Sequence, residues 1–226
     1  MDSTVNIYLQ RKEYWQHKDA TVKSVVGDNN DCNLPDIKCS NELLFGLVRS
    51  LNLHTHYALD CAAGIGRVTQ YVLTNYYDNV DLVEQDVKFI NKAKEVLANN
   101  NKVKHFYIDN IEKYDFQNKC KFYDLIWIQW CLENIENEDI NNFINKCYNV
   151  LKDDGIVIVK ENIYIEESDS EDNKDIKSKT DFSNIRPDIY YMNLFTNNGF
   201  IVYKHFLNPN WPEELIPLVV YVLKKK

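Results

Sequence analysis

A turn of small residues follows the apolar run that begins at Ala58, in the segment ALDCAAGIGRVT. Small residues let a ligand approach the backbone closely, and the N–H groups at the start of a following helix attract negative charge. The turn holds Gly64 and Gly66 but no third glycine, and Arg67 follows directly. A cationic arginine there suits the carboxylate of an amino-acid-like cofactor better than a pyrophosphate. We therefore expect a small cofactor at this turn, and a nicotinamide dinucleotide is disfavoured.

Polar side chains end three later apolar runs. Glu84 ends the second run, about 20 residues after the glycine turn, where a carboxylate can accept both hydroxyls of a ribose. Gln129 and Asn162 end two further runs, and polar residues at such ends favour a binding site over a core role. Trp127 and Trp130 are an odd number of positions apart, so they point to opposite faces of a strand. We expect one of them in the core and the other beside the ligand.

Short apolar runs alternate with helical patterns through most of the chain. Strands are predicted at 57–61, 80–84, 102–108, 122–130, 155–162, 200–207 and 215–224. Strands that alternate with helices indicate a parallel sheet with helices on both faces. The last two runs are adjacent, which predicts an antiparallel C-terminal hairpin. The predicted fold class is α/β, a doubly wound, Rossmann-like, mostly parallel sheet of seven strands that binds ligands at the carboxyl ends of its strands.

The N-terminal part departs from this alternation. Residues 4–18 mix aromatic and charged residues at helical spacing, and residues 27–39 are rich in turn formers, so we expect a helix outside the sheet and then a loop. Ser40 is predicted to cap the helix that follows. We therefore divide the chain into an N-terminal helical extension or lid, 1–50, and one compact cofactor-binding domain, 51–226.

A charged stretch interrupts the second half of the chain. Residues 165–181, IEESDSEDNKDIKSKTD, hold too little apolar surface to fold alone, so we predict a mobile insertion. The helical pattern that follows begins at Pro187 and ends at Gly199, two residues typical of helix boundaries.

The composition, with 45% hydrophobic and 27% charged residues, is that of a globular protein. A net charge of −8 suits a basic peptide better than a nucleic acid. No apolar stretch approaches the roughly 20 residues of a membrane span, and the first residues lack an apolar signal core, so we expect neither membrane insertion nor export. The six cysteines lack zinc-ligand spacing. We expect reduced buried thiols, no metal, and a location in the cytoplasm and nucleus.

Several motifs together resemble the protein α-N-terminal methyltransferases, which act on Xaa-Pro-Lys or Xaa-Pro-Arg N-termini. DLIWIQW at Asp124–Trp130 carries the resemblance most strongly, and ALDCAAGIGR is nearly as specific. The remaining matches are Tyr14-Trp15, Thr21-Val22, Gly27, GIVIVKEN at 155–162 and the tail WPEELIPLVVYVLK. The resemblance implies a class I methyltransferase whose cofactor is S-adenosyl-L-methionine and whose product is S-adenosyl-L-homocysteine.

The resemblance also implies a set of site residues. The implied cofactor contacts are Ala62, Gly64, Arg67, Glu84, Gln85, Asp86, Ile111, Glu112 and Gln129. The implied substrate contacts are Trp15, Trp130, Asn162 and Ser183. The implied catalytic positions are Asp181, Asn162 and Asn134.

Four positions depart from the family pattern. The first turn glycine is Ala62, and the ribose-binding aspartate is Glu84. The second proposed base, a histidine in the family, is Asn134, which cannot take up a proton at neutral pH. The acidic residue that recognises a substrate Lys or Arg aligns on Ser178. Acidic residues of the insertion are candidates to replace it.

Methyl transfer from a sulfonium to an amine needs close positioning and a neutral nucleophile. Because an α-amino group has a pKa of about 7.7–8.0, a modest base suffices. We expect Asp181 to accept the proton, directly or through water, and Asn162 to orient the amine. Trp15 and Trp130 are expected to wall the pocket and favour cationic groups over their rings.

Three alternatives stay open at this point. A small-molecule amine methyltransferase has the same fold, since fold does not fix the substrate. A non-catalytic methyltransferase-like binding module is favoured by Ala62 and Asn134. A nicotinamide dehydrogenase is the least supported. In the leading interpretation the partners are protein substrates with basic Xaa-Pro-Lys/Arg N-termini, and neither nucleic acid nor membrane is bound. The sequence does not define the oligomeric state, although a monomer is favoured.

Overall fold

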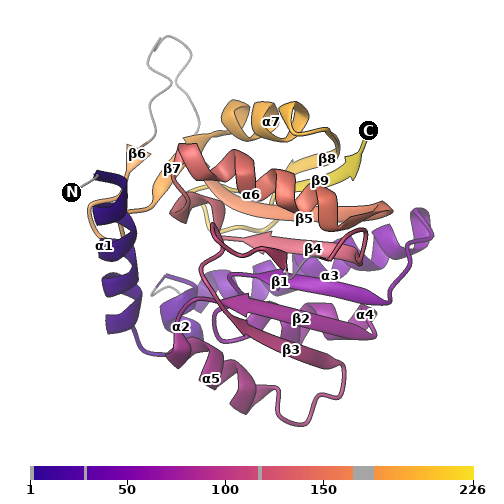
Figure 1. The fold of residues 1–226 in the computed structure, drawn as a ribbon, viewed down its shortest axis with the longest axis horizontal. Coiled ribbons are helices and arrows are strands. Elements are labelled where there is room, and N and C mark those ends of the chain that lie inside the picture. The colour runs from indigo at the N-terminus through magenta and orange to yellow at the C-terminus, as the bar shows by residue number, and fades with distance from the viewer. Residues whose placement is uncertain (1–2, 28–29, 117–118, 165–175) are drawn as a thin grey trace.

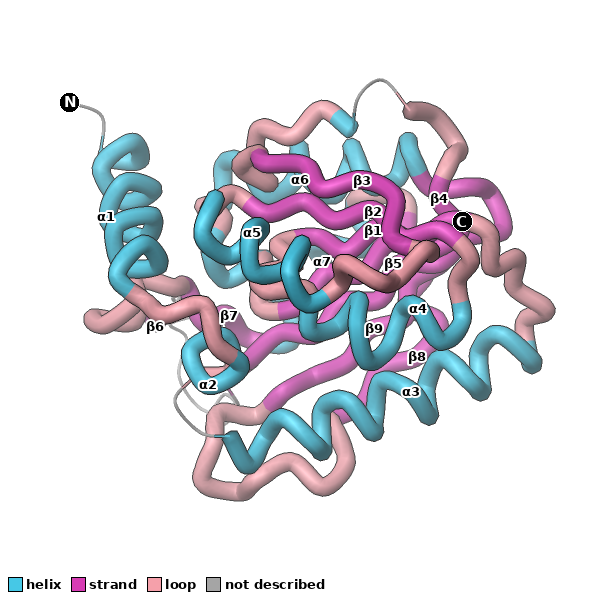
Figure 2. The backbone as a smooth tube through the Cα atoms, turned by 90° about the horizontal axis from the view of Figure 1, so that it is seen from below, coloured by secondary structure: helices cyan, strands magenta, loops and turns pink. Residues whose placement is uncertain are grey.

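The computed structural model describes residues 3–27, 30–116, 119–164 and 176–226. A central sheet carries helices on both faces, and α1, Ser3–His17, stands apart from the sheet in both views (Figures 1 and 2). The α/β class and the separate N-terminal helix are therefore confirmed.

The main sheet has the order β3-β2-β1-β4-β5-β9-β8. Its strands are β1 Tyr57–Cys61, β2 Asn79–Glu84, β3 Val103–Ile108, β4 Tyr123–Gln129, β5 Leu151–Tyr164, β8 Phe200–Leu207 and β9 Leu218–Lys225. The first five are parallel, and β9 lies antiparallel between β5 and β8, so the predicted C-terminal hairpin is confirmed. Two short strands, β7 Asn184–Pro187 and β6 Ile176–Lys177, extend the sheet beyond the end of β5.

Helices cover both faces because the central strands are apolar on both sides. The helical elements are α2 Val22–Val25, α3 Asn33–Ser50, a π-helical turn Thr69–Leu73 continued by α4 Thr74–Tyr76, α5 Val87–Val96, α6 Asn137–Val150 and α7 Asp188–Asn197. Short 3₁₀ turns, η1 Asn30–Cys32 and η4 Leu132–Asn134, complete the described set.

The core consists of two layers, one on each face of the sheet. Phe143 of α6 and Phe195 of α7 pack in the first layer. Leu44 of α3 packs in the second with Trp127 of β4, which is fully buried. Trp130 lies just past the end of β4 with a φ of 50° and leaves the sheet. The prediction of one core tryptophan and one outside the core is confirmed.

The start of α3 corrects the predicted loop and cap. The helix begins at Asn33, so residues 33–39 are helical, and Ser40 lies inside the helix. The Ser40 hydroxyl donates to the Asp36 carbonyl at 2.7 Å and accepts from the Lys160 amino group at 2.9 Å. Asp36, one of the turn-forming residues of this segment, makes buried polar contacts with Lys160 and Gln129 of the sheet. Pro35 is tolerated because it lies in the first turn of the helix.

The remaining expectations have mixed outcomes. Most of the predicted insertion, 165–175, lies outside the described residues, and β6 occupies part of the rest. Five cysteines are buried and free as expected, whereas Cys120 is exposed. None of the helices described here is both long and apolar enough to cross a bilayer. No cluster of metal-ligating side chains occurs in the described parts of the chain.

Candidate active site

A cavity of about 360 Å³ lies at the carboxyl ends of β1, β2, β4 and β5. Thirteen of the predicted site residues line it: Trp15, Ala62, Gly64, Arg67, Glu84, Gln85, Ile111, Glu112, Gln129, Trp130, Asn134, Asn162 and Asp181. Two do not. Asp86 instead caps α5 by accepting from the Lys88 N–H at 2.7 Å, and Ser183 is buried behind Asp181. The volume lies within the range of roughly 300–1,000 Å³ typical of small-molecule sites.

The glycine turn and Glu84 form one end of the cavity. The two carboxylate oxygens of Glu84 accept hydrogen bonds from Gly64 N at 2.9 Å and Asp86 N at 2.8 Å. Each oxygen keeps a second lone pair, so the carboxylate can still accept two vicinal hydroxyls. Gly64 and Gly66 have φ values of 56° and 77°, which only glycine adopts without strain. The donor and acceptor set therefore fits the ribose of S-adenosylmethionine.

Asp60, at the end of β1, fixes the helix that follows the turn. Its buried carboxylate accepts from the backbone N–H of Thr69 at 3.2 Å and from the Thr69 hydroxyl at 2.6 Å. Burial raises the pKa of Asp60 to about 6, despite these hydrogen bonds. The two ends of the turn between Asp60 and Thr69 are thus joined by hydrogen bonds.

A buried charge cluster, which sequence reasoning missed, lies beneath the centre of the cavity. Asp36 of α3 pairs with Arg67 at 2.7 Å and also contacts the amino group of Lys160. The Gln129 amide donates to Asp36 at 2.9 Å, and its carbonyl accepts from the Trp127 indole at 3.0 Å. Burial opposes ionisation, but Lys160 and Arg67 together lower the pKa of Asp36 to about 2. The lysine inside the apolar run GIVIVKEN was the available signal for a buried acidic partner.

Arg67 follows the glycine turn at the ribose end of the cavity, and its side chain reaches Trp130 at the other end. Its guanidinium also donates to Asn33 at 3.2 Å and lies 5.3 Å from the centre of the Trp130 ring. Much of its hydrogen-bonding capacity is therefore used within the protein. Its predicted contact with the cofactor carboxylate stays a prediction.

Both expected tryptophans line the cavity, and Trp211 is a third aromatic residue there. Trp15 packs edge-on against Phe89 of α5, with ring centres 6.1 Å apart. Trp130 faces Trp211, from the loop between β8 and β9, at 6.3 Å. The Trp130 indole nitrogen is buried and has no hydrogen-bond partner among the described residues. Trp211 belongs to the tail motif, but nothing in its sequence context placed it at the cavity.

The turn that carries Trp130 and Asn134 is fixed from two sides. Glu161 of β5 accepts from the N–H groups of Cys131 and Leu132, both at 2.8 Å. The buried guanidinium of Arg186, on β7, donates to the carbonyls of Leu132 at 2.8 Å and Ile135 at 2.6 Å. Because both contacts are buried and charged, η4 is held firmly against the sheet. Burial raises the pKa of Glu161 to about 7.

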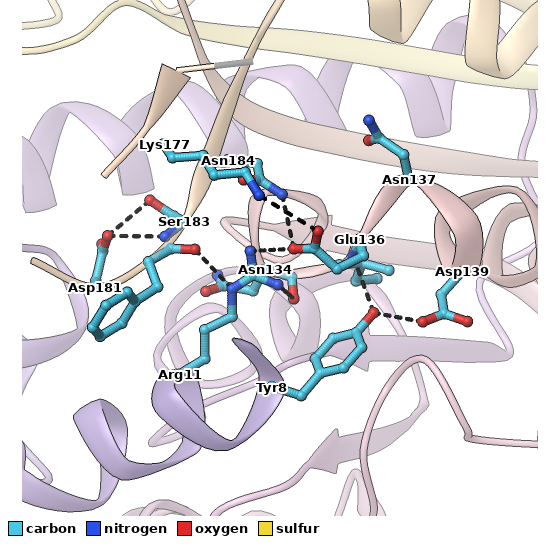
Figure 3. A network of polar contacts seen from close by, with 12 residues as sticks. Tyr8, Arg11, Asn134, Glu136, Asn137, Asp139, Lys177, Asp181, Ser183 and Asn184 are labelled. Carbon is cyan, nitrogen blue, oxygen red and sulfur yellow. Dashed lines mark hydrogen bonds and ion pairs between the residues drawn. The ribbon is translucent and has the colours of Figure 1, made fainter. Parts of the chain in front are cut away.

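A polar clasp, formed by Tyr8 and Arg11, attaches α1 to this turn (Figure 3). Arg11 donates to the Phe182 carbonyl at 2.8 Å and the Asn134 carbonyl at 2.9 Å, and it pairs with Glu136 at 2.6 Å. The Tyr8 hydroxyl donates to the Asp139 carboxylate of α6 at 2.7 Å. Helix α1, η4 and the segment before β7 are thereby brought together.

Asp181 lies at the edge of the cavity and is half-buried. Its carboxylate accepts from the backbone N–H and the hydroxyl of Ser183 at 3.1 and 2.9 Å (Figure 3). Burial alone raises the pKa of Asp181, but hydrogen bonds from Ser178 and Ser183 lower it below its ordinary value. Asn134 donates its amide to the Trp130 carbonyl at 3.2 Å. The cavity also includes Glu133, which sequence reasoning missed.

These features together define a class I methyltransferase: a sheet with one antiparallel strand next to its edge, a glycine turn after β1 and a carboxylate at the end of β2. The family model described as AdoMet-dependent proline di-methyltransferase matches residues 3–224. The chain belongs to this family, and its cofactor is S-adenosylmethionine. The predicted family, fold class and cofactor are confirmed, which removes the nicotinamide dehydrogenase.

Individual relatives agree with this assignment. The chain is 31% identical over 225 residues to an alpha N-terminal protein methyltransferase 1 of Dictyostelium discoideum, covering 97% of this chain and 80% of that protein. It is 33% identical over 159 residues to an N-terminal Xaa-Pro-Lys N-methyltransferase 1 of Bos taurus, covering 69% and 70%. A solved Leishmania major SAM-dependent methyltransferase superimposes with a TM-score of 0.86 at 33% identity, covering 96% of this chain and 83% of that one.

Proposed function

We propose that this protein transfers methyl groups from S-adenosylmethionine to the α-amino group of proteins that begin with Xaa-Pro-Lys or Xaa-Pro-Arg. The observation that carries the proposal is a tryptophan-walled, acidic pocket next to the ribose site. Trp130 and Trp211 form one wall, and Glu112, Glu133 and Asp181 supply the acidic side chains. The printed names of the Dictyostelium and Bos taurus relatives support the same substrate class.

The chemistry of the pocket suits the first residues of a basic peptide. An α-ammonium group is attracted both to carboxylates and to the faces of tryptophan rings. The Trp130 indole nitrogen, which lacks a partner in the described chain, can donate to a substrate carbonyl. The net charge of −8 favours the approach of a cationic peptide.

The bound cofactor supplies an electrophilic methyl group on a positively charged sulfur. The protein must then hold the amine in line with that methyl group and exclude water. Asn162, at the end of β5, lines the pocket and is suited to orient the amine through its side-chain carbonyl. Asp181 attracts the ammonium group, since its lowered pKa keeps it ionised at neutral pH. The same low pKa makes it a poorer proton acceptor than the sequence suggested.

Mass spectrometry of a peptide library with varied first three residues tests the proposal. Peptides that begin with Xaa-Pro-Lys or Xaa-Pro-Arg should gain methyl groups, and their N-terminally acetylated copies should not. Methylation of free small amines without methylation of any peptide would instead assign a small-molecule methyltransferase. Cofactor binding by calorimetry without turnover of any peptide or amine would assign a binding module.

A further inference from the structure

Glu133 is a buried carboxyl group in the wall of the acceptor pocket. It occupies the centre of η4, is 8% exposed, and lines the same cavity as Asn162 and Asp181. The side-chain amide of Asn162, the residue proposed to orient the amine, lies close enough to Glu133 to favour its ionised form and so to oppose the rise of its pKa. Asn134, next to Glu133 in the chain, also lines the cavity but carries an amide, which takes up no proton near neutral pH.

The position of Glu133 is fixed by the groups that hold its backbone. The N–H groups of Cys131 and Leu132 are bound by Glu161, and the carbonyl groups of Leu132 and Ile135 are bound by Arg186. Arg11 of α1 binds the next carbonyl, that of Asn134. A side chain on such a turn is held in place without a ligand, which is what a catalytic acid or base requires.

Charged groups from β5, β7 and the segment before β7 act on Glu133, and Arg11 of α1 binds the carbonyl of the next residue, Asn134. Glu161 of β5 and Asp181 before β7 are negative, and Arg186 of β7 is positive. Tyr191 of α7 is buried nearby, and the charges of Glu133, Glu161 and Arg186 all act on its hydroxyl group. Burial is the main cause that raises the pKa of Glu133 well above its ordinary value, and the negative charges of Glu161 and Asp181 add to it. Asn162 and Arg186 act in the opposite direction, but their effects are smaller.

The pocket is thus lined by two carboxyl groups, Asp181 and Glu133, whose pKa values are shifted in opposite directions. Hydrogen bonds from serines lower the pKa of Asp181, whereas burial and neighbouring charge raise that of Glu133. Pairs of titratable groups whose environments separate their pKa values identify which group exchanges protons and which stays charged. A carboxyl group with a raised pKa is a better proton acceptor than an ordinary one for an α-ammonium group with a pKa of about 7.7–8.0.

We propose that Glu133 is the catalytic base that accepts the proton of the substrate's α-ammonium group, an inference that rests on the proposed N-terminal methylation. An N–H bond of the ammonium breaks, its electron pair stays on nitrogen, and the proton moves to the Glu133 carboxylate. The freed lone pair then forms the N–C bond to the methyl group, while the C–S electron pair passes to sulfur. Glu133 finally releases its proton to water. Asp181 stays ionised and balances the positive charge of the methylated amine.

The pH dependence of kcat for the wild-type enzyme and Glu133→Gln tests this role. Glutamine keeps the size of the side chain and its ability to hydrogen-bond Asn162, but it accepts no proton. Without the base, turnover depends on the fraction of amine that is already neutral, which is about one-tenth at pH 7 and one-hundredth at pH 6. We expect kcat of Glu133→Gln to lie about tenfold below the wild-type value at pH 7 and to approach it at pH 9. Below the pKa of Glu133 the wild-type kcat falls as well, so the ratio of the two rates stops growing there.

A second variant, Glu161→Gln, keeps the proposal testable if Glu133→Gln folds poorly. Removing the Glu161 charge lowers the pKa of Glu133, so the acidic fall of kcat should move to lower pH. A merely structural role of Glu133 would not produce this shift. Infrared titration of the protein without peptide gives a readout that does not depend on turnover. The difference between the wild-type and Glu133→Gln titrations should contain one carboxylic-acid band with a pKa well above the ordinary glutamate range, and that band should persist in Glu161→Gln.

Calorimetric affinity for S-adenosylhomocysteine serves as the folding control for both variants. The proposal is overturned if folded Glu133→Gln keeps the wild-type pH profile, or if folded Glu161→Gln shows no acidic shift. Failure of the proposed function looks different, because the wild-type enzyme itself would then methylate no N-terminal peptide. If Glu133→Gln instead loses the same factor at every pH, Glu133 is a positioning residue and the base assignment is wrong.

Discussion

The two halves of the cavity are built in different ways. In the cofactor half, Glu84 binds the N–H of Gly64, 20 positions away, and both belong to neighbouring strand–turn units. In the acceptor half, Arg11 binds carbonyls 123 and 171 positions away, and Arg186 binds one 54 positions away. Local strand–turn–helix units position the ribose end of the cavity, whereas a few buried cations hold together distant segments around the acceptor end. The acceptor half should therefore be the more sensitive to single substitutions.

Among the variants that test this comparison, Arg186→Met should have the largest effect, a loss of protein stability. It removes charged hydrogen bonds to Leu132, Ile135 and Asn137 in a buried setting. We expect the free energy of unfolding to fall by about 3–5 kcal/mol, a large fraction of ordinary domain stability. Urea unfolding followed by circular dichroism measures the change.

Arg49→Met is the matched control, because Arg49 is exposed near the end of α3 and lies over the Phe45 ring. Its substitution should cost less than about 1 kcal/mol. Equal losses in the two variants would contradict the special role of buried cations in the acceptor half.

Glu84→Gln should affect the cofactor half alone. The glutamine amide would keep one acceptor oxygen, so either a backbone N–H or a ribose hydroxyl loses its partner. We expect the Kd for S-adenosylhomocysteine to rise about 100-fold, which corresponds to about 2.7 kcal/mol. Titration calorimetry measures it, with the exposed Glu95→Gln on α5 as a control of unchanged affinity. An unchanged Kd for Glu84→Gln would remove Glu84 from the ribose site.

Arg11→Met should weaken peptide binding but not cofactor binding. The substitution releases α1 from the Asn134 and Phe182 carbonyls and from Glu136. Ordering this helix then opposes peptide binding, and we expect KM for the peptide to rise about tenfold, or about 1.4 kcal/mol. Steady-state kinetics and cofactor calorimetry on the same preparation separate the two effects. A parallel loss of cofactor affinity would mean that the halves are coupled through α1.

Asn134→His should have the smallest effect in the wild-type background. It places an imidazole where the resembling family has its second base, but Glu133 already serves that role in the proposed mechanism. We expect kcat at pH 7 to change less than about threefold. In the Glu133→Gln background the same histidine should restore most of the lost rate, because an imidazole titrates near pH 6.5. Absence of rescue would argue that position 134 cannot reach the amine.

The same contrast explains what the sequence could predict. The glycine turn, Glu84 and the order of strands and helices are local patterns, and each can be recognised without the structure. Asp36 was missed because its helix begins in a segment rich in turn formers. Glu133 was missed because its role depends on Glu161, Asp181 and Arg186, which are distant in sequence. Burial and charge that arise only after folding leave no periodic signal along the chain.

The position of β9 has a consequence for how the protein acquires its activity during synthesis. This strand follows every other described strand in the chain, yet it lies between β5 and β8 and pairs with Ile156–Asn162 of β5. A nascent chain that has exposed β1 and β2 already contains the segments of the ribose site. Until translation has passed β9, it lacks the antiparallel partner of β5, and the loop with Trp211 is anchored at one end only. We therefore expect the peptide-binding slot to be complete only after β9 has left the ribosome.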